Sequence, residues 1–256
     1  MVDILRCSDS LGPSGYSLSM SEKAGLEVSM LQRKQEQGLE RDLMLWGKLM
    51  GDENDYLVCY TLRSPTLEEG EFPIKEYYYC TVNDTALRQM PQLNENCKAL
   101  AAKCKGRFKG DPSLPLDKEP EEQDDGDEEA KGPERFREVH RLAYTVQAID
   151  RDVAVIPKGA LIVEPSHKIT MSSTYAGLTY EQAGDIRSYY HFRRPENIHS
   201  IAALAKKGLV KDDEFLDPLS SDKPAAMWSL TYDSSSSNAT LRSFLWPGYV
   251  FFAEVG

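Results

Sequence analysis

The side chains best suited to acid–base or metal chemistry are four histidines. They are His140, His167, His191 and His199. None stands at the spacing of a metal site or catalytic triad, and the sequence has no Gly-x-Ser-x-Gly, His-Glu-x-x-His or dinucleotide-binding motif. His191 lies between two aromatic residues and ahead of two arginines. It could simply be a residue at the end of a helix that is hydrogen-bonded to carbonyl groups, with no catalytic role. We expect no catalytic residue. The sequence does not exclude a catalytic site assembled from residues that are distant along the chain.

Five cysteines could bind a metal or form disulfides. They are Cys7, Cys59, Cys80, Cys97 and Cys104. Their odd number and the lack of Cys-x-x-Cys spacing indicate a reduced, cytosolic-type compartment. Cys97 and Cys104 would share one helical face, but two thiols without a histidine at ligand spacing do not make a zinc site. We expect buried structural thiols, no bound metal and no cofactor.

A basic, glycine-rich stretch at 105–112 invites a phosphate-binding interpretation. It reads Lys-Gly-Arg-Phe-Lys-Gly-Asp-Pro. It lacks the Gly-Lys-Ser/Thr ending of a nucleotide-binding loop and follows a helix instead of opening one. The sequence favours a short strand and a turn here.

Two aromatic residues and two arginines form the one candidate contact patch, and they are Tyr190, Phe192, Arg193 and Arg194. Arginine and aromatic side chains are enriched in protein interfaces. The same residues could instead brace the end of a helix expected over 179–190. Both interpretations stay open at this point.

The stretch around which we expect the rest of the chain to be organised is an antiparallel hairpin at 43–62. Two apolar runs, 43–50 and 56–62, flank an acidic bridge rich in turn formers. Trp46 would anchor it, and both faces should be covered because the runs are nearly continuous in hydrophobicity. Trp228 and Trp246 are expected to be largely buried on hairpins as well.

The remaining pattern predicts an α+β fold with a mostly antiparallel sheet of hairpins and several packed helices. In the first helix, Ala24, Val28 and Leu31 recur at helical spacing, with Leu26 and Met30 nearby, and Glu22 is expected on a solvated face. Helices are expected over 21–37, 91–104, 133–149, 179–190 and 196–207, with strands over 72–82, 228–232, 239–246 and 249–253 and a hairpin over 153–163.

Charge and composition set the domain plan and exclude some partners. The formal net charge is −11, and ten acidic and two basic residues lie in 117–134, so the rest is nearly neutral. We expect an irregular 1–18 and a single domain over 19–256, interrupted by a mobile acidic insertion at about 113–132. No basic face, membrane-length apolar run or secretory signal is present, so nucleic acid and membrane are not expected partners.

Five stretches carry a further signal. They read Leu-Trp-Gly-Lys-Leu-Met-Gly with Asp-Tyr in 43–60, the 105–112 loop, Ile-Asp-x-Asp with Val-Ile-Pro-Lys-Gly-Ala-Leu in 149–161, Gly-Leu with Ser-Tyr-Tyr-His-Phe-Arg-x-Pro in 177–195, and Leu-Arg-Ser-Phe-Leu-Trp-Pro-Gly in 241–248. Together they resemble the radial spoke head protein 9 family of motile cilia.

The resemblance implies a non-catalytic structural subunit of the radial spoke head in the ciliary or flagellar axoneme, part of the cytoskeleton. Its partners would be other radial spoke head proteins, those of types 4 and 6 and their neighbours, with the central-pair projections met indirectly. The subunit would help to pass signals from the central pair to the dynein arms and so control beating. The alternative is an enzyme or small-ligand-binding protein of unknown substrate.

Overall fold

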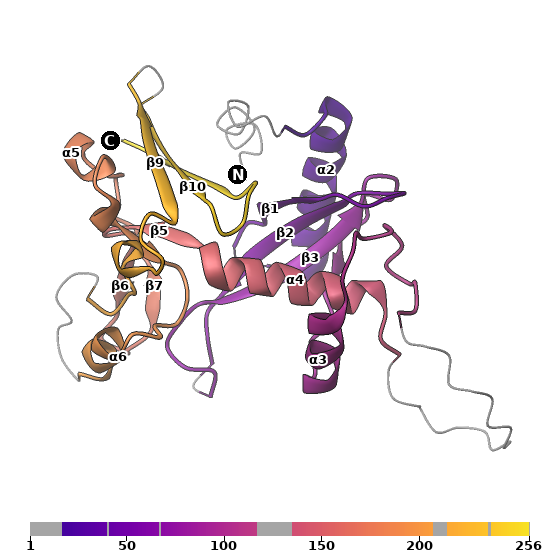
Figure 1. The fold of residues 1–256 in the computed structure, drawn as a ribbon, viewed down its shortest axis with the longest axis horizontal. Coiled ribbons are helices and arrows are strands. Elements are labelled where there is room, and N and C mark those ends of the chain that lie inside the picture. The colour runs from indigo at the N-terminus through magenta and orange to yellow at the C-terminus, as the bar shows by residue number, and fades with distance from the viewer. Residues whose placement is uncertain are drawn as a thin grey trace, which may run out of the picture. The chain divides into compact units, whose positions relative to one another are not determined.

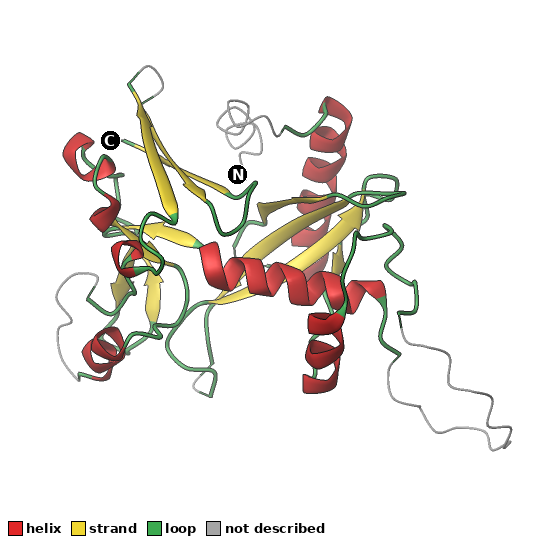
Figure 2. Cartoon of the chain, viewed as in Figure 1, coloured by secondary structure: helices red, strands yellow, loops and turns green. Residues whose placement is uncertain are grey.

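A computed structural model describes residues 17–39, 41–66, 68–116, 135–206, 214–234 and 237–255. Helices alternate with antiparallel sheets, which confirms the expected α+β fold (Figure 2). Most of the expected acidic insertion, from residue 117, and of the expected irregular start lies outside the described residues. No described helix is long and apolar enough to cross a membrane.

The order of elements along the chain can be followed in Figure 1. The elements are α2 (Met20–Gln37), β1 (Met44–Leu49), β2 (Tyr56–Arg63), β3 (Ile74–Thr81), β4 (Arg88–Gln89), α3 (Glu95–Lys103), α4 (Glu138–Val153), β5 (Val155–Pro157), β6 (Leu161–Val163), β7 (Ile169–Met171), α5 (Tyr180–Ala183), η2 (Ile186–Ser188), β8 (Tyr189–His191), α6 (Ile198–Ala205), η3 (Leu219–Ser221), β9 (Trp228–Asp233), β10 (Asn238–Ser243) and β11 (Val250–Glu254).

The chain divides into two compact units. Unit 1 holds Met20–Thr61 and Glu76–Ala148, and unit 2 holds Leu62–Lys75 and Ile149–Gly256. The single domain expected over 19–256 stays a prediction, and each unit is described by itself.

The sheet of unit 1 has the strand order β1-β2-β3-β4, and its first two strands form the expected hairpin. A bulge between Leu45 and Gly47 leaves Trp46 as the extra residue of β1. β2 is buried almost throughout, as its continuous apolar run predicted.

Helix α4 supplies the apolar face that covers this sheet. Leu142, Ala143 and Val146 recur at helical spacing and pack against a cluster that includes Tyr56 and Val58. Burying a side chain of this size stabilises a protein by about 1.5–3 kcal/mol, so the helix–sheet contact dominates the packing of unit 1.

A buried carboxylate joins the sheet, a loop and α4 in unit 1. Glu138, the first residue of α4, accepts hydrogen bonds from the Tyr56 hydroxyl at 2.7 Å and from the backbone N–H groups of Lys109 and Gly110, both at 2.8 Å. Gly110 has φ +97°, and a Cβ there would lie 2.3 Å from the Asn54 carbonyl oxygen. Only glycine lets the loop approach closely enough for this contact.

Helix α2 has the predicted extent but turns a different face inward. Leu26 and Met30 are buried, whereas Val28 and Leu31 are exposed, so the expected stripe was wrong. Glu22 is buried on the same side and accepts a hydrogen bond from Lys48 of β1 at 2.8 Å. The buried face depends on contacts with residues far along the chain, which the sequence of the helix does not encode.

Unit 2 contains the sheet β11-β10-β9 and two small sheets, β5-β8 and β6-β7. The β9–β10 and β10–β11 hairpins confirm the expected strands. The hairpin expected over 153–163 was wrong. Its turn exists, with Gly159 at φ +80° and Ala160 N–H donating to Pro157 O at 3.2 Å, but β5 and β6 each pair with a later strand. Two strands of three residues can form only a few hydrogen bonds with each other. The pairing of β5 and β6 therefore depends on strands further along the chain, β8 and β7.

The tryptophans lie on hairpins as expected, but Trp46, Trp228 and Trp246 are each only partly buried. The indole N–H of Trp228 donates to Asp222 at 2.8 Å, and that of Trp246 donates to Asp152 at 3.0 Å. Carboxylates near the surface hold these two rings at the edge of the core.

Glu138→Ala should lower the free energy of unfolding by about 3 kcal/mol or more, because it leaves a buried hydroxyl and two backbone N–H groups without an acceptor. Glu95→Ala is the matched control. Glu95 is also the first residue of a helix, but its side chain is 89% exposed, so the expected loss is about 0.5 kcal/mol or less. Urea unfolding measures both, and equal losses would contradict the role of Glu138.

Candidate functional site

The helix expected over 179–190 was wrong: the chain there forms α5, η2 and strand β8, and of the predicted contact residues only Tyr190 lies in β8. Thr179 and Gln182 form the predicted capping box, but α5 ends at Ala183. Asp185 then caps the short η2, and β8 follows. The helix stops early because β8 finds backbone partners on both edges, and adjacent aromatic residues favour extended structure.

Strand β8 is held between β5 and the chain at Asp217 and Pro218. Val155 pairs with His191, and Phe192 N–H donates to Ala154 O at 2.8 Å. On the other edge, His191 N–H donates to Asp217 O at 2.9 Å. A short strand is stable here because both of its edges are hydrogen-bonded.

The four predicted residues lie in different surroundings, since Tyr190 is in β8 and the other three follow the strand. Tyr190 and Phe192 lie on one face and pack against a buried cluster that includes Phe215. The Phe192 ring also lies 4.5 Å from the Lys75 ammonium. Both aromatic side chains are therefore partly buried in unit 2 and do not form an exposed patch with the arginines.

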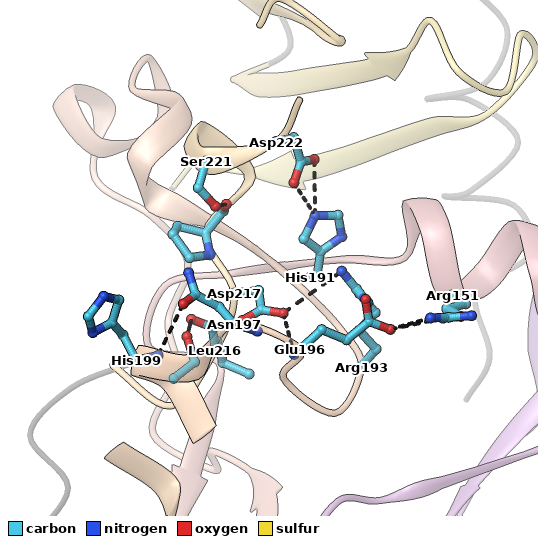
Figure 3. Close-up of polar contacts among 12 residues, drawn as sticks. Arg151, His191, Arg193, Glu196, Asn197, His199, Leu216, Asp217, Ser221 and Asp222 are labelled. Atoms are coloured by element: carbon cyan, nitrogen blue, oxygen red, sulfur yellow. Dashed lines mark hydrogen bonds and ion pairs between the residues drawn. The ribbon is translucent and has the colours of Figure 1, made fainter. Parts of the chain in front are cut away.

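Asp217 is a buried carboxylate that orders the segment after β8 (Figure 3). Its two oxygens accept hydrogen bonds from the backbone N–H groups of Glu196 at 2.7 Å and Asn197 at 3.1 Å. Asn197 in turn caps α6, since its side chain accepts from His199 N–H at 3.0 Å. One carboxylate thus sets where α6 begins.

The two arginines have different environments. Arg193 is 21% exposed and lies 2.5 Å from Glu196 and 3.8 Å from Asp217. Its guanidinium, with that of Arg151, lowers the pKa of Glu196 against the opposing effect of burial. Arg194 is 72% exposed, with Glu71 at 3.9 Å. Arg193 therefore belongs to an internal ion network, and only Arg194 offers a charge to a partner.

His191 and Asp222 form the most chemistry-like pair of the site. The His191 Nε2 atom lies 2.8 and 3.0 Å from the two oxygens of Asp222, which also accepts from Trp228. Burial alone would raise the pKa of Asp222, but these hydrogen bonds lower it below the usual 3.8. The buried His191 Nδ1 atom has no hydrogen-bond partner among the described residues. An Asp–His pair of this kind could orient a base, but no described hydroxyl or thiol completes a triad.

Asp217 and Asp222 could not be identified as site residues from the sequence. Asp222 is 31 positions from His191, and neither aspartate lies in a local motif. Four exposed apolar side chains were missed as well: Phe244 at 66%, Leu245 at 50%, Ile198 at 80% and Ile201 at 47%. The apolar composition of α6 on both faces was the one signal that could have revealed Ile198 and Ile201.

Phe244 and Leu245 stand on a fixed loop. The Ser243 hydroxyl accepts hydrogen bonds from the N–H groups of Leu245 at 3.2 Å and Trp246 at 3.4 Å. Tyr249 N–H donates to Trp246 O at 3.0 Å, and Gly248 has φ +103°, which confirms the predicted type II turn. The loop holds both apolar side chains in the exposed position without needing a partner to order it.

Within the described ranges, no group of three or more His, Cys, Asp or Glu side chains could hold a metal ion. Cys97 is buried as expected, whereas Cys104 is only partly buried because it forms the end of α3. The four described cysteines are free thiols.

Comparisons with known proteins give one consistent result. The chain is 33% identical to a radial spoke head protein 9 homolog of Danio rerio over 248 residues, which cover 95% of this chain and 87% of the relative. The identity is 31% over 242 residues for the homologs of Homo sapiens and Xenopus tropicalis, covering 93% of this chain and 85% of each relative. No protein-family model matches the chain.

Asp222→Asn should lower the free energy of unfolding by about 2 kcal/mol at pH 7, because a charged acceptor is lost from two hydrogen bonds. The pKa of Asp222 is depressed in the folded state, so its stabilisation is present above the unfolded pKa of about 3.9 and is lost as the pH falls through the folded pKa.

Urea unfolding from pH 7 to pH 3 measures this dependence. The difference between Asp222→Asn and the unmodified chain should shrink below about pH 4. A difference that stays constant across the range would mean that the Asp222 charge contributes nothing.

Proposed function

The chain belongs to the radial spoke head protein 9 family, and from this premise we propose that it is a non-catalytic structural subunit that binds other radial spoke head proteins. As a family member it is a radial spoke head component of the ciliary or flagellar axoneme. The observation that carries the proposal is that the similarity runs through almost the whole of the chain and most of each relative. Both compact units therefore belong to the shared protein.

Exposed apolar side chains support a binding role. Phe244 and Leu245 project from a loop held by its own hydrogen bonds, and Ile198 and Ile201 lie on one side of α6. Each of these two pairs exposes large apolar side chains next to each other, and exposed apolar patches mark protein-interaction surfaces. Because the loop is already ordered, binding there would cost little conformational entropy.

Arg194 is the charged part of the proposed contact surface. Its guanidinium is mostly exposed, and the nearest carboxylate, Glu71, is at the limit of an ion pair. An acidic group of a neighbouring head subunit could replace that weak contact with a bidentate pair. Partners of types 4 and 6 and their neighbours would supply it. Through these contacts the subunit would help to transmit signals from the central pair to the dynein arms.

The alternative, an enzyme or ligand-binding protein, has one observation in its favour, the His191–Asp222 pair. The pair also has a structural role, because it links β8 to the end of η3 and to Trp228 of β9. Experiments in cilia distinguish the two proposals. A structural subunit is needed for the assembled spoke head, whereas an enzyme is needed for the reaction that it catalyses.

Cilia that lack the protein should still assemble microtubules but beat abnormally, because the spoke head would be incomplete while the motors remain. High-speed imaging of beating and purification of the chain from cilia give the two readouts. The chain with His191→Gln should restore beating if the protein is structural. Normal beating after complete removal, or a spoke head that assembles fully without the chain, would overturn the proposal.

Arg194→Glu should reduce recovery of the chain with the spoke head several-fold while its unfolding free energy changes by less than about 0.5 kcal/mol, as for an exposed residue. Arg193→Glu is the matched comparison. It places a third carboxylate beside Glu196 and Asp217 and should destabilise unit 2 by about 2 kcal/mol or more.

Recovery from cilia and urea unfolding are measured on both variants. Unchanged recovery of Arg194→Glu would remove this arginine from the contact surface. Phe244→Ser with Leu245→Ser then tests the apolar contact separately, and full recovery of that double variant would remove the loop as well.

A further inference from the structure

The sheet β11-β10-β9 of unit 2 ends in a strand, β9, that pairs on one side, with β10. β9 is six residues long and reads Trp-Ser-Leu-Thr-Tyr-Asp, with Asp233 at its end as its one charged residue. An exposed strand edge is a template for pairing with another chain. Lysines, prolines, bulges or short length normally protect such edges, and β9 has none of these features.

The other edge strands in the described part of the chain are each protected in one of these ways. β1 has a bulge and carries Lys48, β4 has two residues, and β5 and β6 have three each. On β7, Ile169 N–H donates to Glu71 O at 2.8 Å, and β8 is bonded on both edges. On β11, Val255 forms a bridge with Leu178. Among the described strands, β9 therefore has the one long unprotected edge.

The hydrogen bonds beside β9 define which of its backbone groups point outward. Phe244 N–H donates to Met227 O at 2.9 Å, in the register that the β9–β10 pairs continue. Bonded pairs recur at every second residue of an antiparallel ladder, so Thr231 bonds to β10 while Leu230 and Tyr232 turn their N–H and C=O groups outward. No described residue forms a hydrogen bond with these outward groups.

The side chains of Leu230 and Tyr232 also lie at the margin of the core. They pack against the cluster that contains Ala239 and Leu241 of β10, but they are only partly buried, whereas those two residues are completely buried. The difference is that β10 has a strand on each side. A strand added beside β9 would cover these side chains and bond the outward backbone groups together.

We propose that the outer edge of β9 pairs with an extended segment of a neighbouring protein, which adds a fourth strand to this sheet. Backbone hydrogen bonds would give the affinity, and apolar residues at every second position of the segment would pack beside Leu230 and Tyr232. The edge begins at Met227, across from the exposed Phe244, and so adjoins the proposed contact surface. The inference rests on the proposed function, because it gives that surface a binding mode.

A second copy of this chain is not the occupant we infer. Each copy carries a formal net charge of −11, and two copies with charge of the same sign repel each other. An uncharged or basic extended segment meets no such repulsion.

An NMR titration of the full chain tests the edge without cilia. The probe is the peptide acetyl-Asn-Ala-Thr-Leu-Arg-Ser-amide, which copies β10, the strand that already pairs with the other side of β9. It should shift the amide signals of Leu230 and Tyr232 saturably and slow the deuterium exchange of these two amides. The same peptide N-methylated at every residue cannot donate backbone hydrogen bonds, and it should bind at least about fivefold more weakly.

Tyr232→Pro and Tyr232→Ala form a matched pair of variants. Both remove the same ring, but only proline removes the outward N–H, and an edge strand tolerates proline at such a position. Tyr232→Pro should reduce both peptide affinity and recovery of the chain with the spoke head several-fold relative to Tyr232→Ala. Deuterium exchange of the β10 amides reports whether each variant is folded. If Tyr232→Pro is unfolded, the N-methylated peptide makes the same comparison on the unmodified chain.

Three results would overturn the proposal: no saturable shift with the β10 peptide, equal binding of its N-methylated form, or equal recovery of the two folded variants with the spoke head. Light scattering examines the other occupant. A dimer of the unmodified chain that Tyr232→Pro converts to a monomer would assign the edge to a second copy and would also overturn the proposal.

Failure of this inference and failure of the proposed function give different results. A chain that binds the peptide along β9 but is not recovered with the spoke head contradicts only the function. A chain that is recovered with the head but does not bind the peptide contradicts only the pairing at β9.

Discussion

A carboxylate removed from water must find hydrogen-bond donors, and in this chain two buried carboxylates find them in the backbone. Glu138 takes two consecutive N–H groups, of Lys109 and Gly110, and Asp217 takes another consecutive pair (Figure 3). Losing either carboxylate would leave buried donors unpaired, which costs about 1–3 kcal/mol for each group. The shape of the loop at Lys109–Gly110 and of the segment before α6 therefore depends on these two carboxylates.

Loops that are ordered by internal hydrogen bonds suit the proposed role of a subunit bound to neighbouring proteins. Loops fixed by internal hydrogen bonds can display side chains such as Phe244 and Leu245 without first being ordered by a partner. Most charges near the proposed contact surface already have partners, as the network of Arg151, Arg193 and Glu196 illustrates. In the proposed contact surface, the few exposed groups that are weakly paired would then determine which partner is selected.

Much of the local structure could be predicted because the contacts that make it are near in sequence. The β1–β2 and β9–β10 hairpins, the Thr179–Gln182 capping box and the turn at Gly248 all depend on residues within a few positions of each other. The α+β class follows from the same periodicities. The family could also be recognised from short motifs, because each motif is a continuous stretch of the sequence.

What the sequence by itself determined was where most of the helices and strands form, the segment 179–190 excepted, and where several of them turn. Only the tertiary structure decided which face of α2 is buried, which strands β5 and β6 pair with, and that Arg193 is internal while Arg194 is exposed. The reason is physical. A short strand or an amphipathic helix has several partners of similar energy, and the choice depends on distant groups such as Lys48, Asp217 and Asp222, whose positions exist only after the chain has folded.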